Sequence, residues 1–383
     1  MSNYELQLSL KNSAATNMSD VSRQPTLVDL PPIVLILGGS GYIGTHLMLE
    51  LHGNPYQIAI VDIKPPSSQA IAYAETRAGE LPVLFFSFDL ETLPVCSATY
   101  PQFPRVPFAG IMLAALKDVS ESERLPYEYI RKNNTLCVNS MEYLSQLGIT
   151  RLIHASSAAV YADSRPESRI PQLESTAQPE PIGVYGYTKA VSESTVRRLV
   201  NCRDKLNQHA VILRYMNPIG SHPIIDAFSD FGICSSLART TQNRAFVNRG
   251  NCMRDYIHIT DLASFHTTLL KYWDRVFVDV KPFVTIFNVG NGVAVTVDEI
   301  VETFGKNSGF KSRTISYESR NSFEPLYTVG SMAKAALYFR EWWNSPRRSL
   351  QSSVADYRRL MTTEGEGTLE HIESNDDTKC VVS

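Results

Sequence analysis

Residues 33–51 read IVLILGGSGYIGTHLMLEL, an apolar run followed by a cluster of glycines and then by apolar residues at helical spacing. Gly38, Gly41 and Gly44 recur at every third position of this cluster. Glycine permits a tight turn and lets the backbone N–H groups of a helix N-terminus approach a pyrophosphate. The stretch therefore predicts a strand, a phosphate-binding loop and a helix, which together open a dinucleotide-binding fold.

Further apolar runs follow, separated by helical stretches. They are YQIAIVDI (56–63), LPVLFFSFDL (81–90), FAGIMLAAL (108–116), TRLIHASSAAVY (150–161) and HAVILRYMNPIG (209–220). Continuous apolar strands that alternate with helices are typical of a parallel sheet covered on both faces. We therefore expect an α/β protein with a Rossmann-type, doubly wound parallel sheet.

An acidic residue ends the second predicted strand, where IAIV is followed by Asp62. A carboxylate at this place accepts the adenosine ribose hydroxyls and repels a 2′-phosphate, so the sequence favours NAD over NADP. Asp89 ends the third strand and could reach the adenine amino group. The alternative is that either aspartate is only a turn residue at a strand end. In the loop itself, the expected NAD contacts are Gly38, Gly41, Tyr42, Ile43 and Gly44.

The regularity changes after about residue 220, and four segments are expected. Residues 1–31 form a flexible leader, residues 32–218 the NAD-binding domain, residues 219–361 a smaller α/β substrate-binding lobe, and residues 362–383 a disordered acidic tail. No run approaches eighteen apolar residues, and the N-terminus lacks a secretory signal, so we expect a cytoplasmic protein.

Composition narrows the classes of partner. The 383 residues carry a net charge of −3, which gives no reason to expect a nucleic acid. Six cysteines are scattered without a CxxC motif or a Cys/His cluster, which argues against a zinc site and a disulfide framework. The compartment is expected to be reducing, and the five internal cysteines to be small buried hydrophobes.

A tyrosine and a lysine lie one helical turn apart in VYGYTK, residues 184–189. Tyrosine is a poor base near its free pKa of about 10, but a neighbouring lysine and the positive nicotinamide stabilise the phenolate. Upstream, Ser156 and Ser157 end a buried strand, where a hydroxyl can share the proton of a substrate. Tyr185 and Lys189 are thus candidate catalytic residues; the alternative is an ordinary surface pair.

With these motifs together, the sequence resembles the extended short-chain dehydrogenase/reductase family over residues 33–361. The resemblance makes Ser157, Tyr185 and Lys189 the catalytic trio. AALKDVSES (114–122) is similar to the AGLKAVGES segment of UDP-galactose 4-epimerases, which implies that Lys117 contacts the cofactor and that Ser122 lies beside the nicotinamide. Other cofactor contacts assigned on this basis are Leu90, Ala114 and Asn133.

Three later segments also look like those of 4-epimerases: RYMNPIGSHP (214–223), RDYIHITDLA (254–263) and FNVGNGVAVTVDEIV (287–301). They imply that Asn217 and Arg254 bind the substrate diphosphate. ESRNSFEP (318–325) stands where the epimerases have an arginine before Gly-Asp, which implies Arg320 as a second arginine in an altered segment. Two arginines suit a diphosphate, because charge-assisted forks hold its oxygens. The alternative is a solvated surface arginine in each case.

This chain departs from the epimerases on the substrate side. GICSSL (232–237) stands where they have GIPNNL, so Ser235 and Ser236 replace two asparagines, with Ser236 assigned to the substrate. The loop before RDYIH is shortened. Thr328 aligns with a position that is small in enzymes accepting N-acetylated sugars, which suggests tolerance of the larger substrate.

The resemblance implies an NAD-dependent isomerase that interconverts UDP-galactose and UDP-glucose, or the N-acetylated pair, through a 4-keto sugar. Tyr185, assisted by Ser157, takes the 4-hydroxyl proton while the C4 hydride moves to NAD and later returns to the opposite face. Two alternatives remain: another nucleotide-sugar epimerase, dehydratase or decarboxylase, and a non-catalytic relative that binds the cofactor. Family members are commonly homodimers, which we also expect here.

The sequence ends in CVVS, which fits a prenylation signature at Cys380. One lipid without a second signal gives only weak, reversible membrane association. The alternative is an unmodified tail of a cytosolic enzyme.

Overall fold

The computed structural model describes residues 30–363, apart from gaps at 93–100, 102, 104, 162–170, 176–179, 203–206, 231, 240–243, 250–251, 279–282, 309–313 and 320–321. The chain divides into residues 1–31 and residues 32–383, and the following description concerns the second unit. Of the predicted site residues, Arg320 and Cys380 lie outside the described residues.

A seven-stranded sheet forms the centre of the described part, in the order β11-β6-β5-β4-β1-β2-β3. Every neighbouring pair is parallel. The prediction of a doubly wound parallel sheet is confirmed, because the strand order proceeds from β1 through β2 to β3 toward one edge of the sheet and from β4 through β5 and β6 to β11 toward the other edge. The strands are β1 (Ile33–Leu37), β2 (Gln57–Asp62), β3 (Leu84–Ser87), β4 (Ala109–Met112), β5 (Arg151–Ser157), β6 (His209–Tyr215) and β11 (Val284–Val289).

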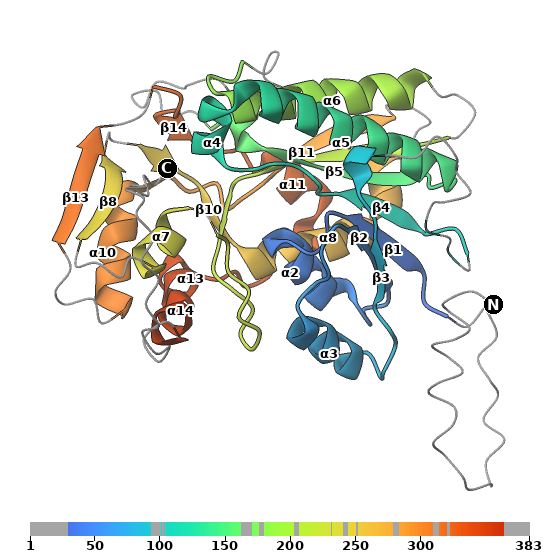
Figure 1. Ribbon diagram of the computed structural model, residues 1–383, viewed down its shortest axis with the longest axis horizontal. Helices are drawn as coiled ribbons and strands as arrows, with labels where there is room; N and C mark the ends of the chain where they lie inside the picture. Colours follow the sequence, from blue (N-terminus) through green and yellow to red (C-terminus); the bar gives the residue numbers. More distant parts are fainter. Residues whose placement is uncertain are drawn as a thin grey trace, which may run out of the picture. The chain divides into compact units, whose positions relative to one another are not determined.

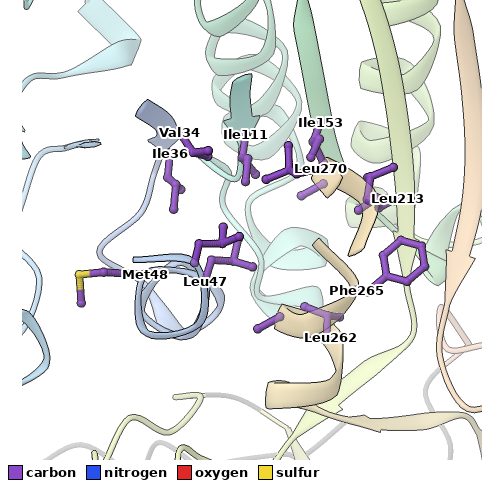
Figure 2. Close-up of a cluster of buried hydrophobic side chains, with 14 of the residues drawn as sticks. Val34, Ile36, Leu47, Met48, Ile111, Ile153, Leu213, Leu262, Phe265 and Leu270 are labelled. Atoms are coloured by element: carbon purple, nitrogen blue, oxygen red, sulfur yellow. The ribbon is translucent and has the colours of Figure 1, made fainter. Parts of the chain in front are cut away.

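Helices cover both faces of this sheet (Figure 1). Helices α5 (Pro126–Gln146) and α6 (Val184–Cys202) pack together on one face, and α2 (Tyr42–Leu51) and α8 (Ile259–Lys271) on the other. Figure 2 shows side chains of α2 and α8 meeting those of the sheet in a core that includes Val34, Leu47, Ile111, Leu213 and Phe265. Burial on both faces explains why the strands are continuous apolar runs.

Four shorter helical segments in the described part of the chain follow strands of this sheet or precede α5. Helix α3 (Ser68–Arg77) follows β2, and a single 3-10 turn at Leu90–Thr92 follows β3. Helix α4 (Val119–Arg124) precedes α5. A second 3-10 turn, Ala158–Val160, leaves the end of β5.

The remaining strands form small sheets. β7 (Asn217–Ile219) pairs with β10 (Tyr256–His258), and β8 (Arg244–Arg249) pairs with β13 (Thr314–Ser319). β9 (Met253–Arg254) lies between β12 (Val295–Thr296) and β14 (Tyr327–Thr328). The other helices are α7 (Ile233–Arg239), α9 (Trp273–Val276), α10 (Val297–Ser308), α11 (Ala333–Tyr338), α12 (Arg340–Trp343), α13 (Leu350–Ala355) and α14 (Tyr357–Thr363).

A second hydrophobic core joins α7, α10 and the last helices. Its buried members include Leu237, Ile300, Phe304, Val354 and Tyr357. The boundary at residue 219 stays a prediction, and β11 and α8, which follow it in the chain, belong to the large sheet and its cover.

The cysteines follow the prediction in part. Cys137, Cys234 and Cys252 are buried free thiols, whereas Cys202 is exposed at the end of α6, so the prediction that it is buried is wrong. Cys96 lies outside the described residues. Within the described segments, no helix has the length and hydrophobicity needed to span a bilayer.

Candidate active site

The loop between β1 and α2 contains two glycines that the fold itself requires. A Cβ on Gly38 would lie 2.6 Å from the Cα of Ala114, and its φ of +76° is strained for other residues. A Cβ on Gly44 would lie 2.3 Å from the Gly39 carbonyl oxygen. Strands β1 and β4, which carry Gly38 and Ala114 just beyond their ends, are adjacent at the point where the strand order reverses. Ligands of doubly wound sheets bind at this point.

Gly41 has a different role from its neighbours. A Cβ on Gly41 would meet nothing within 4 Å, and its φ of −80° is ordinary. Gly41 is the N-cap of α2 and lines the cavity described below, and no side chain caps this helix end. The missing side chain therefore leaves open space at a helix N-terminus, which fits the pyrophosphate of a dinucleotide.

The two predicted carboxylates lie in the same cavity wall. Asp62 accepts hydrogen bonds from the N–H groups of Ser40 at 3.0 Å and Lys64 at 3.3 Å, so it also holds the phosphate loop against β2. Asp89 accepts the N–H of Glu91 at 2.8 Å and lines the cavity beside Leu90. Each aspartate therefore both stabilises a turn through backbone hydrogen bonds and lines the cavity.

Of the residues assigned to the cofactor on β4 and α5, Ala114 and Lys117 line the cavity and Asn133 does not. Burial lowers the pKa of Lys117, and Asp230 opposes that shift. The Asn133 amide accepts the Leu116 N–H at 2.7 Å, and it donates to the Leu116 carbonyl at 3.1 Å and to Thr188 at 3.0 Å. It therefore clamps the loop after β4 to α6 from behind the wall.

Helix α4 caps the helix that carries the tyrosine. The Ser122 hydroxyl accepts the N–H of Tyr185 at 3.2 Å, and Glu123 accepts the N–H of Val184 at 2.6 Å. Ser122 is fully buried and donates to the Val119 carbonyl, so it supports α6 and does not lie in the cavity wall. No sequence motif indicates this capping role of Glu123, because its partner is 61 residues away in the chain.

Ser157, Tyr185 and Lys189 come together at the end of β5 and the first turns of α6, and all three line the cavity. The Lys189 ammonium donates to the Ala155 carbonyl at 2.9 Å and lies 5.9 Å from the centre of the Tyr185 ring. The Ser157 hydroxyl accepts the N–H of Ala159 at 3.1 Å, and its interaction with the Tyr185 hydroxyl acts to lower the pKa of the tyrosine. Ser156 instead donates to Glu193 at 2.6 Å, so Ser157 is the serine available to a substrate.

Burial is the main cause of the pKa shifts of Tyr185 and Lys189. It raises the pKa of Tyr185 to about 12, and the hydrogen bond from Ser157 only partly opposes it. It lowers the pKa of Lys189 to about 8. The expected stabilisation of the phenolate includes the positive nicotinamide as well as the lysine, so it stays a prediction for the protein with NAD bound.

The substrate-side predictions converge on the same cavity. Asn217 donates to the Asp255 carbonyl at 3.0 Å, and Arg254 and Thr328 are register partners on β9 and β14. All three line the wall, and among the described residues the buried Thr328 hydroxyl has no hydrogen-bond partner. Ser235 is buried and does not line the cavity; it donates to the carbonyl of Ser229, which does. The side chain of Ser236 lies outside the described residues.

A cavity of about 1000 Å³ connects these groups, from the phosphate loop past the tyrosine to Thr328. Residues of both the large sheet and the small sheets line this cavity. Its volume suits two elongated ligands that meet beside Ser157, Tyr185 and Lys189. The sequence missed other wall residues, for which no motif exists: Ile182, Gly183, Phe323, Glu324 and Pro325.

Comparison with known proteins agrees with this geometry. The chain is 32% identical over 293 residues to a UDP-glucose 4-epimerase of Schizosaccharomyces pombe, covering 72% of this chain and 80% of that protein. Its fold matches that of UDP-glucose 4-epimerase from Bifidobacterium longum in complex with NAD+ and UDP, with a TM-score of 0.73, 22% identity, and coverage of 88% of this chain and 100% of that one.

A UDP-Glc/GlcNAc 4-epimerase from Campylobacter jejuni also matches, with a TM-score of 0.69, 25% identity, and coverage of 87% and 99% of the two chains. Residues 34–290 match the model of the NAD dependent epimerase/dehydratase family. With the phosphate loop, the Ser/Tyr/Lys trio and this match together, the chain belongs to the NAD dependent epimerase/dehydratase family.

Proposed function

We propose that this protein is a UDP-hexose 4-epimerase that interconverts UDP-galactose and UDP-glucose, and also the N-acetylated pair, through a 4-keto sugar. The observation that carries the proposal is the single cavity in which the Ser157, Tyr185 and Lys189 trio lies between the phosphate loop and the wall with Asn217, Arg254 and Thr328. Relatives named UDP-glucose 4-epimerase at about a third identity support it.

The trio is suited to moving one proton at the sugar 4-hydroxyl. When bound, NAD would supply a reversible hydride acceptor at the carbon that carries this hydroxyl. Tyr185 takes the hydroxyl proton and returns it, and Ser157 shares it by hydrogen bonding. Since Lys189 has a pKa of about 8, it is mostly protonated at neutral pH and places positive charge beside the phenolate.

The phosphate loop and the substrate wall divide the binding of the two ligands. Gly41 and the start of α2 would receive the cofactor pyrophosphate, and Asp62 the adenosine ribose. Arg254 and Asn217 would hold the substrate diphosphate, because a guanidinium fork matches phosphate oxygens. Arg320 stays the predicted second arginine for the diphosphate, and Ser236 stays a predicted contact of the substrate.

The wall beside the trio favours epimerisation over dehydration. Dehydratases resembling this family generally carry an acidic pair after the catalytic serine, whereas this chain has Ala158 there, buried and lining the cavity. Ala158 therefore offers no carboxylate at this position for removal of a neighbouring proton and loss of water.

The test is to incubate the purified protein separately with UDP-galactose and UDP-N-acetylgalactosamine, without added NAD, and to separate the products. Conversion to the gluco epimers would support the proposal and retention of the cofactor. The ratio of the rates for UDP-galactose and UDP-N-acetylgalactosamine measures whether the cavity beside Thr328 accepts the larger N-acetylated sugar. A 4-keto-6-deoxy product would replace the proposal with a dehydratase, and absence of any product from NAD-loaded protein would favour a non-catalytic relative.

A second copy of this chain is the partner we propose for the outer surface of α5 and α6. Tyr127 is 89% exposed, and Leu125, Val138 and Tyr187 are also exposed there. Light scattering on the purified protein tests this homodimer, and a monomer at micromolar concentration would contradict it. Prenylation of Cys380 and weak membrane association stay predictions from the sequence.

A further inference from the structure

A buried carboxylate lies one helical turn beyond the catalytic lysine, and the mechanism above makes no use of it. Glu193 is 1% exposed in the middle of α6. A buried charge is unfavourable unless it is paired and hydrogen-bonded. The structure therefore must compensate it, and the compensating groups come from three different elements.

Arg214 on β6 supplies the main compensation. Its guanidinium, also buried, donates to both oxygens of Glu193, at 2.8 and 2.7 Å. Arg197 on α6 lies 3.5 Å from the same carboxylate. The Arg214 guanidinium in turn lies 4.8 Å from the centre of the Tyr161 ring. The two-point fork fixes the orientation of the carboxylate as well as its position.

The third group is Ser156 at the end of β5, which donates to Glu193 at 2.6 Å. Ser156 is adjacent in the chain to Ser157, so this bond fixes the strand end from which the Ser157 hydroxyl reaches Tyr185. Glu193 thereby joins α6, which carries Tyr185 and Lys189, to β5, which carries Ser157.

Glu193 also supplies the negative charge near the catalytic lysine. The described groups that act on the Lys189 ammonium are the Ala155 carbonyl, Tyr185, Cys137 of α5, His154 of β5 and Glu193. Burial raises the pKa of Cys137 to about 12 and lowers that of His154 to about 3, so both are neutral near pH 7. Glu193 is the one carboxylate among these groups, and its interaction with the ammonium raises the pKa of Lys189 against the effect of burial.

We propose that Glu193, locked by Arg214, is a positioning residue of the active site: it holds the Ser156–Ser157 strand end against α6 and places a carboxylate one helical turn beyond Lys189. The inference rests on the proposed function, since it assigns Glu193 to the same proton transfer. It predicts that the charge of Glu193 matters for more than stability.

The test compares Glu193→Gln with Glu174→Gln. Glu174 accepts the N–H of Asn288 at 3.0 Å, and Asn288 also bonds Tyr161, which contacts Arg214, so the control removes a carboxylate from the far end of the same network. For Glu193→Gln we expect kcat to fall on the order of 10- to 100-fold, with KM within about twofold. The alkaline limb of the kcat profile should move to lower pH, because the lysine then loses its proton more easily. For Glu174→Gln the alkaline limb of the kcat profile should lie at the same pH as in the wild type.

A second readout needs no substrate. In protein labelled with 13C-lysine, the Lys189 resonance, assigned by its loss in Lys189→Arg, should titrate near pH 8 in the wild type and about one unit lower in Glu193→Gln. An unchanged midpoint would overturn the electrostatic part of the proposal, even if no UDP-hexose is turned over. If the wild type titrates as expected but turns over no UDP-hexose, the proposed function fails and this inference about the charge stands.

Ser156→Ala covers the case in which Glu193→Gln does not fold. It leaves the Glu193–Arg214 pair intact and removes only the link to β5. We expect kcat to fall roughly 3- to 10-fold with the Lys189 midpoint unchanged. Wild-type kcat in this variant would overturn the positioning part.

Discussion

The two ends of the cavity are built in different ways. At the phosphate-loop end, backbone packs on backbone: added Cβ atoms at Gly38 and Gly44 would lie 2.6 and 2.3 Å from neighbouring main chain. At the substrate end, Asn217, Arg254 and Thr328 stand on strands of only two or three residues. Close backbone packing restricts the residue types at the first end, whereas side-chain recognition at the second end lets the sequence vary. This difference matches the nearly intact cofactor motifs and the altered GICSSL and Arg320 segments.

The largest effect should come from the point where the two ends meet. Tyr185→Phe removes the proton carrier and keeps the ring, so we expect turnover of UDP-galactose to fall about 10²- to 10⁴-fold with the bound NAD and the melting temperature little changed. Product formation and the cofactor content of the purified variant are the measurements. Turnover above a tenth of the wild-type rate would mean that another group carries the proton.

The phosphate loop offers a matched pair of glycine substitutions. Gly38→Ala should lower the free energy of unfolding by about 2 kcal/mol or more, because it adds a clash with Ala114 to a strained φ. Gly41→Ala should cost at most about 1 kcal/mol, as a weaker N-cap, yet lower the affinity for NAD. Denaturant unfolding and NAD titration of the two variants separate fold from binding. Equal unfolding energies in both would contradict the assignment.

Substitutions at the substrate end of the cavity should change the KM for the nucleotide sugar. Arg254→Ala should raise the KM for the nucleotide sugar about 10- to 100-fold, the value of a charge-assisted fork to phosphate, while NAD binding stays the same. Arg254→Lys keeps the positive charge but loses the two-point guanidinium contact, so its KM should lie between those of the wild type and Arg254→Ala. If KM is unchanged in Arg254→Ala, the diphosphate binds elsewhere in the cavity.

The smallest effect concerns acid stability of the sheet core. Burial lowers the pKa of His266 to about 4, and its ring donates to the Leu262 carbonyl and accepts the Tyr215 hydroxyl. The folded state therefore holds this histidine neutral, whereas the unfolded chain binds a proton near pH 6.5, so stability is lost as the pH falls below that value. Between pH 6.5 and 5.5 the loss is about 1 kcal/mol.

His266→Gln should remove this part of the pH dependence, measured as the difference between the two unfolding free energies in the wild type and the variant. His46 and His154 act in the same direction, and Asp255, whose pKa is raised to about 7 by burial, acts in the opposite one. The single variant isolates His266. An identical slope in both proteins would mean that the ring is already protonated in the folded state.

Much of the fold could be predicted because its signals are local. A buried parallel strand is an apolar run, and the glycine spacing of the phosphate loop follows from one tight turn and one helix start. The Tyr185 and Lys189 pair was recognisable for the same reason, since four positions in a helix put two side chains on one face. By contrast, the hydrogen bonds of Asn133 and Ser122 to the loop after β4 and to α6 could not be predicted, because a sequence motif does not say which way a buried side chain turns. Their assignment to the cofactor stays a prediction.

The sequence by itself determined the α/β class, the phosphate loop and the residue types of the trio, because periodicity and turn chemistry act between residues close together in the chain. Only the tertiary structure decided that Ser156 bonds Glu193 and leaves Ser157 to the substrate, that Glu123 caps the catalytic helix, and that burial raises the pKa of Tyr185. These properties depend on contacts across tens of residues and on removal from water. Neither is encoded in a local pattern, since both exist only once the chain has packed.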